Sequence, residues 1–203
     1  MLNQDYRLQL KFIRKTIELN DFQMFFTMRD LRDKTAYKKF RSTSADCSGY
    51  LEREKSCRRL MDTFRRAYGL RGGKGNKKEF YYFAVSEAGV GEKHWLSEDC
   101  GHLHICVGWT KDSRYYSKPR ACLDRFIELV NYKYSLRWAS FCCSLRNQNK
   151  MYTIENKVKV SHYMSKPETG TLNGGNFSKE PFWDGPIILP TSNELTLAPL
   201  PLM

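Results

Sequence analysis

Two of the four histidines in this 203-residue chain stand one residue apart, in the apolar stretch CGHLHICVGW at residues 100–109. Such a stretch is typical of a β-strand, in which side chains at positions i and i+2 point to the same face. His102 and His104 therefore share one face. Apolar neighbours such as Leu103 and Ile105 point to the other face and can enter the core. Two imidazoles at this spacing can bind one divalent metal ion.

A third metal ligand is expected on a neighbouring strand. The stretch EFYYFAVSEAG predicts a strand over about residues 79–88, and a loop joins it to the histidine strand. If the two strands form a hairpin, Glu87 lies opposite the start of the second strand, close to His102 and His104. A 2-His-1-carboxylate face leaves coordination positions open for phosphate oxygens, which suits Mg²⁺ or Mn²⁺. The loop offers three competing ligands: His94, Glu98 and Asp99.

The stretch SHYMSK at residues 161–166 supplies a candidate nucleophile, Tyr163, and a cation, Lys166. Residues three apart on a helix share a face. A tyrosine beside a metal-bound phosphate can attack phosphorus. A nearby lysine can lower the pKa of the phenol or neutralise charge that develops on the phosphate. Because the chain has 12 tyrosines, this spacing also fits a tyrosine that only packs in the core.

The charge balance indicates an anionic partner. The chain carries 34 Lys and Arg against 22 Asp and Glu, a formal net charge of +12, which favours nucleic acid over an anionic membrane surface. The glycine-rich basic loop at residues 71–78 could cradle phosphates, although it also fits an exposed loop without a ligand. Aromatic neighbours of Arg114 could stack on unpaired bases. The expected DNA-binding residues are Lys74, Lys77, Lys78, Arg114 and Lys159.

Hydrophobic periodicity predicts an α+β fold with a central, mainly antiparallel sheet of about four to five strands and flanking helices. Helices are expected over the first 20 residues, over residues 50–70 and over residues 118–135. Besides the two strands above, buried strands are expected at Gln23–Met28 and at residues 138–145.

One segment is ambiguous. Lys157–Val160 alternates like a strand, whereas Ser161–Lys166 could form a short helix. Pro167 disfavours a helix that continues through Lys166.

Three motifs, taken in chain order, resemble those of the HUH endonucleases, specifically the single-tyrosine replication initiators of rolling-circle phages, viruses and plasmids. HLH matches the histidine-hydrophobic-histidine motif of that family, and YMSK matches its Y-x-x-K motif. FFTM matches the apolar character of the first motif. The resemblance covers roughly residues 21–168 and implies a nuclease fold of the ferredoxin-like or RRM-like type.

The resemblance also implies a mechanism. Glu87, His102 and His104 would bind Mn²⁺ or Mg²⁺ at the scissile phosphate of single-stranded DNA at a replication origin. Tyr163 would attack that phosphate, giving a 5′-phosphotyrosyl enzyme and a free 3′-OH, and Lys166 would assist. Because the chain has no G-x-x-x-x-G-K-[ST] motif, unwinding would come from a host helicase or from DNA supercoiling. A host polymerase would extend the free 3′-OH.

Three other functions fit the same residues. One is a single-strand transposase of the HUH superfamily, and another is a basic nucleic-acid-binding domain without catalysis. The third is a metal-dependent hydrolase in which Tyr163 is structural.

The domain organisation follows from the motifs and the composition. Residues 1–170 are predicted to form the nuclease domain with its N-terminal helix. Residues 171–203 are rich in Gly, Pro and Leu and are expected to form a tail that lies along the surface or is partly disordered. The seven cysteines form no C-x-x-C pair, and no apolar run could span a bilayer. These features predict a reduced, cytoplasmic protein with no membrane partner. The resemblance implies the cytoplasm of the host cell if a virus or plasmid encodes the chain.

Overall fold

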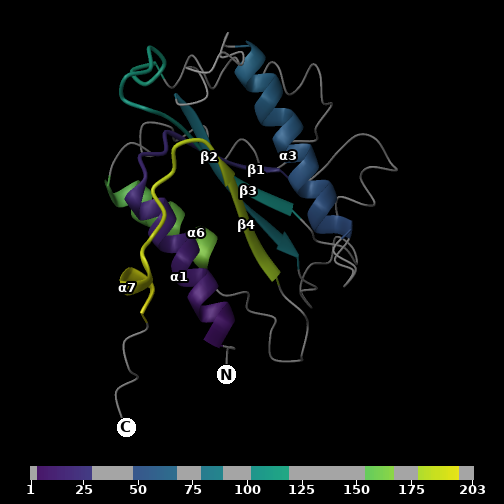
Figure 1. Cartoon of the computed structure of the whole chain (residues 1–203), viewed down its shortest axis with the longest axis vertical. Helices are drawn as coiled ribbons and strands as arrows, with labels where there is room; N and C mark the ends of the chain where they lie inside the picture. Colours follow the sequence, from purple (N-terminus) through teal and green to yellow (C-terminus); the bar gives the residue numbers. More distant parts are fainter. Residues whose placement is uncertain are drawn as a thin grey trace.

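Four antiparallel strands form one sheet in the order β1-β3-β2-β4, within the part of the chain that the structure describes (Figure 1). The computed structural model describes residues 4–28, 48–67, 79–88, 102–118, 154–166 and 178–196. The strands are β1 (Met24–Met28), β2 (Phe80–Ala88), β3 (His102–Trp109) and β4 (Ser178–Asp184). The helices are α1 (Gln4–Leu19), α3 (Ser48–Ala67), α6 (Ile154–Ser165) and the short α7 (Ser192–Leu195). The predicted α+β fold with an antiparallel sheet is confirmed.

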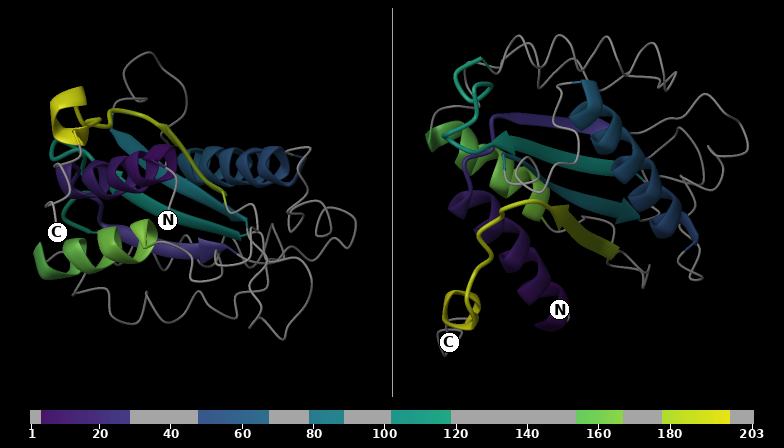
Figure 2. Two further views of the ribbon diagram at one scale, coloured as in Figure 1. Left: turned by 90° about the horizontal axis from the view of Figure 1, so that it is seen from below. Right: turned by 45° about the horizontal axis from the view of Figure 1, so that its top comes forward.

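Helices pack on both faces of the sheet. α1 and α6 lie side by side (Figures 1 and 2), and Phe12 of α1 contacts Phe83 of β2, with ring centroids 6.4 Å apart. α3 packs against the opposite face, where Arg53 Nε donates a hydrogen bond of 2.6 Å to Ser86 Oγ. Phe83 and Ser86 of β2 are both buried, although their side chains point to opposite faces of the sheet. The central strands are therefore covered on both sides.

An apolar cluster fixes α1 and α6 onto the sheet. Ile13 and Ile17 stand one turn apart on α1, which places them on the same helix face. Both pack in one buried cluster with Val85 of β2 and Met164 of α6. Burying each such side chain contributes roughly 1.5–3 kcal/mol relative to exposure. The helix that carries the YMSK motif is thus held by the core beneath it.

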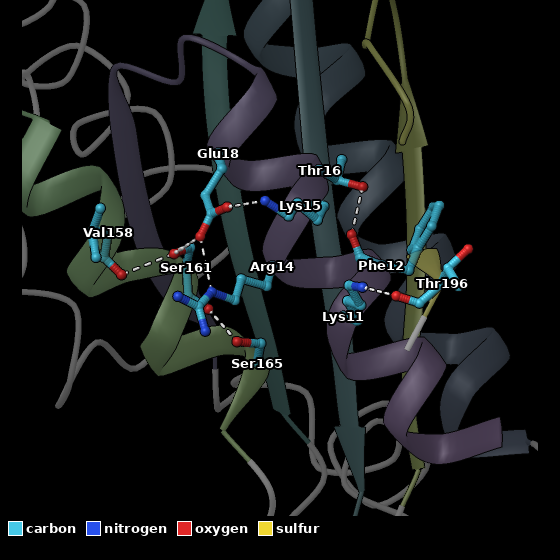
Figure 3. A network of polar contacts seen from close by, with 10 residues as sticks. All are labelled: Lys11, Phe12, Arg14, Lys15, Thr16, Glu18, Val158, Ser161, Ser165 and Thr196. Atoms are coloured by element: carbon cyan, nitrogen blue, oxygen red, sulfur yellow. Dashed lines mark hydrogen bonds and ion pairs between the residues drawn. The ribbon is translucent and has the colours of Figure 1, made fainter. Parts of the chain in front are cut away.

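A polar network also joins α1 to α6 (Figure 3). Glu18 of α1 forms ion pairs with Arg14 at 2.9 Å and Lys15 at 3.2 Å, and Ser161 Oγ of α6 lies 3.4 Å from the same carboxylate. Burial raises the pKa of Glu18, but the hydrogen bonds from Arg14 and Lys15 outweigh this effect and lower the pKa. Glu18 therefore remains an anion that orients the buried Ser161.

The helices and strands that the sequence predicts are present wherever the structure describes those residues. Residues Ile154–Ser165 form one helix, which resolves the ambiguity over Lys157–Val160 in favour of a helix. That helix ends just before Lys166, as Pro167 predicts. The helix expected over residues 118–135 and the strand expected over residues 138–145 lie outside the described residues. No helix among the residues described is long and apolar enough to cross a membrane.

β4 was not predicted from the sequence. The segment SKEPFWD pairs antiparallel with β2, and Pro181 stands opposite Val85. A proline normally argues against a strand, but among the described strands β4 is at the edge of the sheet, where a strand tolerates proline. The region from residue 171, expected to be a tail, thus contains a strand of the sheet.

Candidate metal centre

The site begins as one row of residues across three strands. Glu87 of β2 stands directly opposite His102 of β3 on one side and Lys179 of β4 on the other. Residues that face each other across neighbouring strands have their side chains on the same face of the sheet. His104 joins this row two residues along β3, on the same face. The expected pairing of Glu87 with the start of the histidine strand is confirmed.

The three predicted ligands converge. Glu87 Oε2 lies 3.3 Å from His102 Nε2, Glu87 Oε1 lies 3.5 Å from His104 Nε2, and the two Nε2 atoms are 3.1 Å apart. An ion bound octahedrally at about 2.1 Å holds adjacent ligand atoms about 3 Å apart. The separations match that geometry, and the three ligand atoms all lie within 4.8 Å of one another. This cluster could hold a metal ion. The competing ligands His94, Glu98 and Asp99 lie outside the described residues.

Burial prepares the cluster for a cation. Burial raises the pKa of Glu87, but hydrogen bonds from His102 and His104 outweigh it and hold the pKa well below its usual range. Burial lowers the pKa of His104 to about 4, although Glu87 opposes this effect. A neutral imidazole beside an anionic carboxylate is the state that binds a metal. The side chain of His102 is 20% exposed, so solvent reaches the cluster from that side.

Tyr163 stands beside this cluster. Its ring lies edge-on to the ring of His104, with centroids 5.0 Å apart, and 39% of the residue is exposed. Lys166 Nζ lies 4.9 Å from the centroid of the Tyr163 ring, within the range of a cation–π contact. The structure thus places the predicted nucleophile beside His104 and the predicted lysine against the ring of that tyrosine.

Phe25 completes the aromatic surroundings of the site. Its ring stacks on His104 with centroids 5.8 Å apart and meets the Tyr163 ring edge-on at 5.9 Å. The sequence placed FFTM on a buried strand but did not single out Phe25. Phe25 reaches the site because it pairs with Cys106 across β1 and β3. This pairing places the Phe25 side chain on the same face of the sheet as His102 and His104.

Lys179 is a second residue that sequence reasoning missed. Its side chain is fully buried, and Nζ donates a hydrogen bond to Glu87 Oε1 and another, of 3.2 Å, to the backbone oxygen of Met164. The sequence carried no signal for it, because a lysine in an expected surface tail is ordinary.

The predicted DNA-binding residues are spread over the chain. Lys159 is exposed on α6, one turn before Tyr163. Arg114 is exposed in the turn after β3, at the opposite end of that strand from His102, and its guanidinium lies 4.9 Å from the Tyr115 ring centroid. Lys74, Lys77 and Lys78 lie outside the described residues.

Cys106 shares the histidine face but belongs to the core. Its side chain is fully buried, and Sγ lies 3.4 Å from Met164 Sδ beneath α6. Burial raises the pKa of this thiol. Cys106 therefore packs as an apolar residue and is not one of the clustered ligands.

The arrangement unites a metal-binding cluster, a half-exposed phenol and an ammonium group. A metal ion in such a cluster acts as a Lewis acid toward phosphate oxygens. A phenol can act as a covalent nucleophile. The arrangement is chemically suited to transferring a phosphoryl group to tyrosine. No protein-family model, curated protein or solved structure matches this chain.

Proposed function

We propose that this chain is a metal-dependent enzyme that nicks and rejoins single-stranded DNA through Tyr163, initiating rolling-circle replication as HUH endonucleases do. The observation that carries the proposal is the Tyr163 ring, 5.0 Å from His104 in a cluster that could hold a metal ion. The formal net charge of +12 supports an anionic polymer as the substrate.

The proposed reaction transfers a phosphodiester from DNA to the tyrosine. The phenolic oxygen of Tyr163 forms a bond to phosphorus, and the bond from phosphorus to the 3′-oxygen breaks. The phenolic proton passes to solvent, and the leaving 3′-oxygen takes up one proton from solvent, so protons balance. The products are a 5′-phosphotyrosyl enzyme and a free 3′-OH that can prime synthesis. Attack by a 3′-OH reverses the step without ATP.

The neighbouring residues bind and stabilise negative charge. Mn²⁺ or Mg²⁺ held by Glu87, His102 and His104 would polarise an oxygen of the scissile phosphate. Lys166, whose Nζ lies 4.9 Å from the centroid of the Tyr163 ring, offsets the negative charge that builds up on the phosphate. Lys159, one turn earlier on the exposed side of α6, contacts the DNA backbone.

A covalent-adduct assay tests this function. The full chain is incubated with Mn²⁺ and a labelled single-stranded oligonucleotide library, then denatured and resolved by electrophoresis. We expect a protein–DNA adduct that disappears under chelation and in Tyr163→Phe, which keeps the ring packed against His104. Tyr116→Phe is the matched control, because it removes a hydroxyl that hydrogen-bonds Asp21 away from the cluster, and it should retain the adduct.

Two results would overturn the proposal. Tight DNA binding without any adduct across a broad library would indicate a non-catalytic nucleic-acid-binding domain. Metal-dependent cleavage that persists in Tyr163→Phe would indicate a hydrolase in which the tyrosine only packs.

A further inference from the structure

A fully buried lysine lies behind the metal cluster, on a strand outside the three recognised motifs. Lys179 of β4 stands directly opposite Glu87 of β2. We propose that Lys179 is a positioning residue for the metal ligand Glu87. It holds the Glu87 carboxylate so that one oxygen binds the metal ion (monodentate binding), and it links this carboxylate to the helical turn that carries Tyr163. This inference rests on the proposed function, because it concerns the same metal centre.

The two oxygens of Glu87 have different surroundings. Oε1 accepts the hydrogen bond from Lys179 and also lies 3.5 Å from His104 Nε2, whereas Oε2 lies 3.3 Å from His102 Nε2, on the partly exposed side of the cluster. Because Lys179 binds Oε1, Oε2 is the oxygen that would ligate a metal ion. Partners behind a ligand orient it and commonly change metal affinity by 10–100-fold, roughly, when they are removed.

The same ammonium group contacts α6. Lys179 Nζ lies 3.2 Å from the backbone oxygen of Met164, the residue that follows Tyr163. Carbonyl groups in the last turn of a helix lack partners within that helix, and a cation there also interacts favourably with the helix dipole. Lys179 thus links the metal ligand on the sheet to the end of the helix that presents the nucleophile.

Two opposing effects decide how Lys179 changes metal affinity. Its positive charge repels a divalent ion, so removing it would strengthen binding. Its hydrogen bond holds Glu87 in place, so removing it would weaken binding. We assign the larger effect to the hydrogen bond, because Lys179 joins the Glu87 carboxylate to the backbone oxygen of Met164 and so fixes its orientation.

Mn²⁺ affinity of the full chain, measured by electron paramagnetic resonance of free Mn²⁺, separates these effects. Lys179→Met removes both charge and donor, and we expect binding weakened at least about 10-fold. Lys179→Gln removes the charge but keeps N–H donors for Glu87 Oε1 and for the backbone oxygen of Met164. We expect this variant to bind Mn²⁺ within about threefold of the wild-type affinity. The adduct-forming rate at saturating Mn²⁺ should fall in Lys179→Met without a change in DNA affinity.

Arg53→Met is the matched control. Arg53 is a buried cation that hydrogen-bonds Ser86, next to Glu87 but on the opposite face of the sheet. Its loss should lower stability and leave Mn²⁺ affinity unchanged. If Lys179→Met does not fold by circular dichroism, Lys179→Asn replaces it, because Asn is one methylene shorter than Gln. The inference then requires weaker Mn²⁺ binding in Lys179→Asn than in Lys179→Gln.

Each remaining outcome overturns the inference. Unchanged Mn²⁺ affinity in a folded Lys179→Met protein would leave Lys179 with a packing role only. Tighter binding in both Lys179→Met and Lys179→Gln would show that charge repulsion dominates. A wild-type chain that binds no Mn²⁺ would overturn the proposed function as well, so the two failures are distinguishable.

Discussion

Glu87 and His102 face each other across β2 and β3, with Oε2 and Nε2 3.3 Å apart. The register of this strand pair creates the site. A shift of one residue would turn Glu87 toward α3, on the other side of the sheet, and leave the histidines without a carboxylate.

The metal ligands predict a ligand-dependent gain in stability. Mn²⁺ at about 100 times its dissociation constant should raise the free energy of unfolding of the wild type by about 2.7 kcal/mol. His102→Ala should lose most of this gain at the same Mn²⁺ concentration, because it removes one of three ligands. Urea unfolding with and without Mn²⁺ measures both values. His162→Ala, on the exposed side of α6, should keep the gain. Retention of the full gain in His102→Ala would exclude the cluster as the binding site.

Burial of His104 predicts an acid-sensitive metal-free protein. The pKa of His104 is about 4 in the folded state against 6.5 in the unfolded chain, so the unfolded chain takes up the proton first as pH falls. The free energy of unfolding should therefore decrease below pH 6.5, by about 2 kcal/mol between roughly pH 7 and pH 5. Glu87 lowers the free energy of unfolding further only below pH 4.5, the ordinary pKa of a glutamate, because its pKa is lower in the folded protein.

Urea unfolding in chelator measures this pH dependence, and His104→Gln should flatten it. An equally steep decrease in His104→Gln would assign the acid sensitivity to other groups.

Lys159, exposed on α6, and Lys166, which directly follows that helix, should act on different steps. Lys166→Met should slow adduct formation by about 100-fold with little change in DNA affinity, because Lys166 acts at the Tyr163 phenol and the reacting phosphate. Lys159→Met should weaken DNA binding and reduce the slope of log affinity against log salt concentration by about one. Its effect on the rate of adduct formation should be smaller. Single-turnover kinetics and salt titrations distinguish the two. Equal losses of affinity in both variants would contradict the division of roles.

Phe25 should contribute to catalysis beyond its packing. Phe25→Leu keeps an apolar side chain but loses the flat ring that contacts both His104 and Tyr163. We expect a stability loss of about 1 kcal/mol and a slower adduct-forming step. Phe22→Leu is the control, because Phe22 packs on Tyr81 in the same core. It should lose similar stability without slowing the reaction, and equal slowing in both variants would reduce Phe25 to a packing residue.

The residues on the histidine face of the sheet could be predicted because short-range strand geometry determines them. The two-residue period of a strand fixes which side chains share a face, and a hairpin fixes which strand end meets which. The sequence alone therefore groups Glu87, His102 and His104. α6 was harder, since Lys157–Val160 alternates like a strand. Packing of the helix on α1, including the contact of Ser161 with Glu18, decides its conformation.

Lys179 was beyond sequence reasoning for a physical reason. Its partner Glu87 is 92 residues away along the chain, and no local period relates the two. The edge strand that carries Lys179 contains charged residues and Pro181, which weaken any strand signal. Only the pairing of β4 with β2 brings the ammonium group to the carboxylate.

The central claim is that Tyr163 becomes covalently linked to DNA. The most direct test digests the Mn²⁺-dependent adduct with nuclease and trypsin and locates the remaining nucleotide by tandem mass spectrometry. The account predicts a nucleotide joined through its 5′-phosphate to Tyr163. It should be found in the tryptic peptide that begins at Val160, after cleavage at Lys159. A nucleotide on any other residue, such as Tyr152, or a wild-type protein that yields no linked peptide, would contradict it.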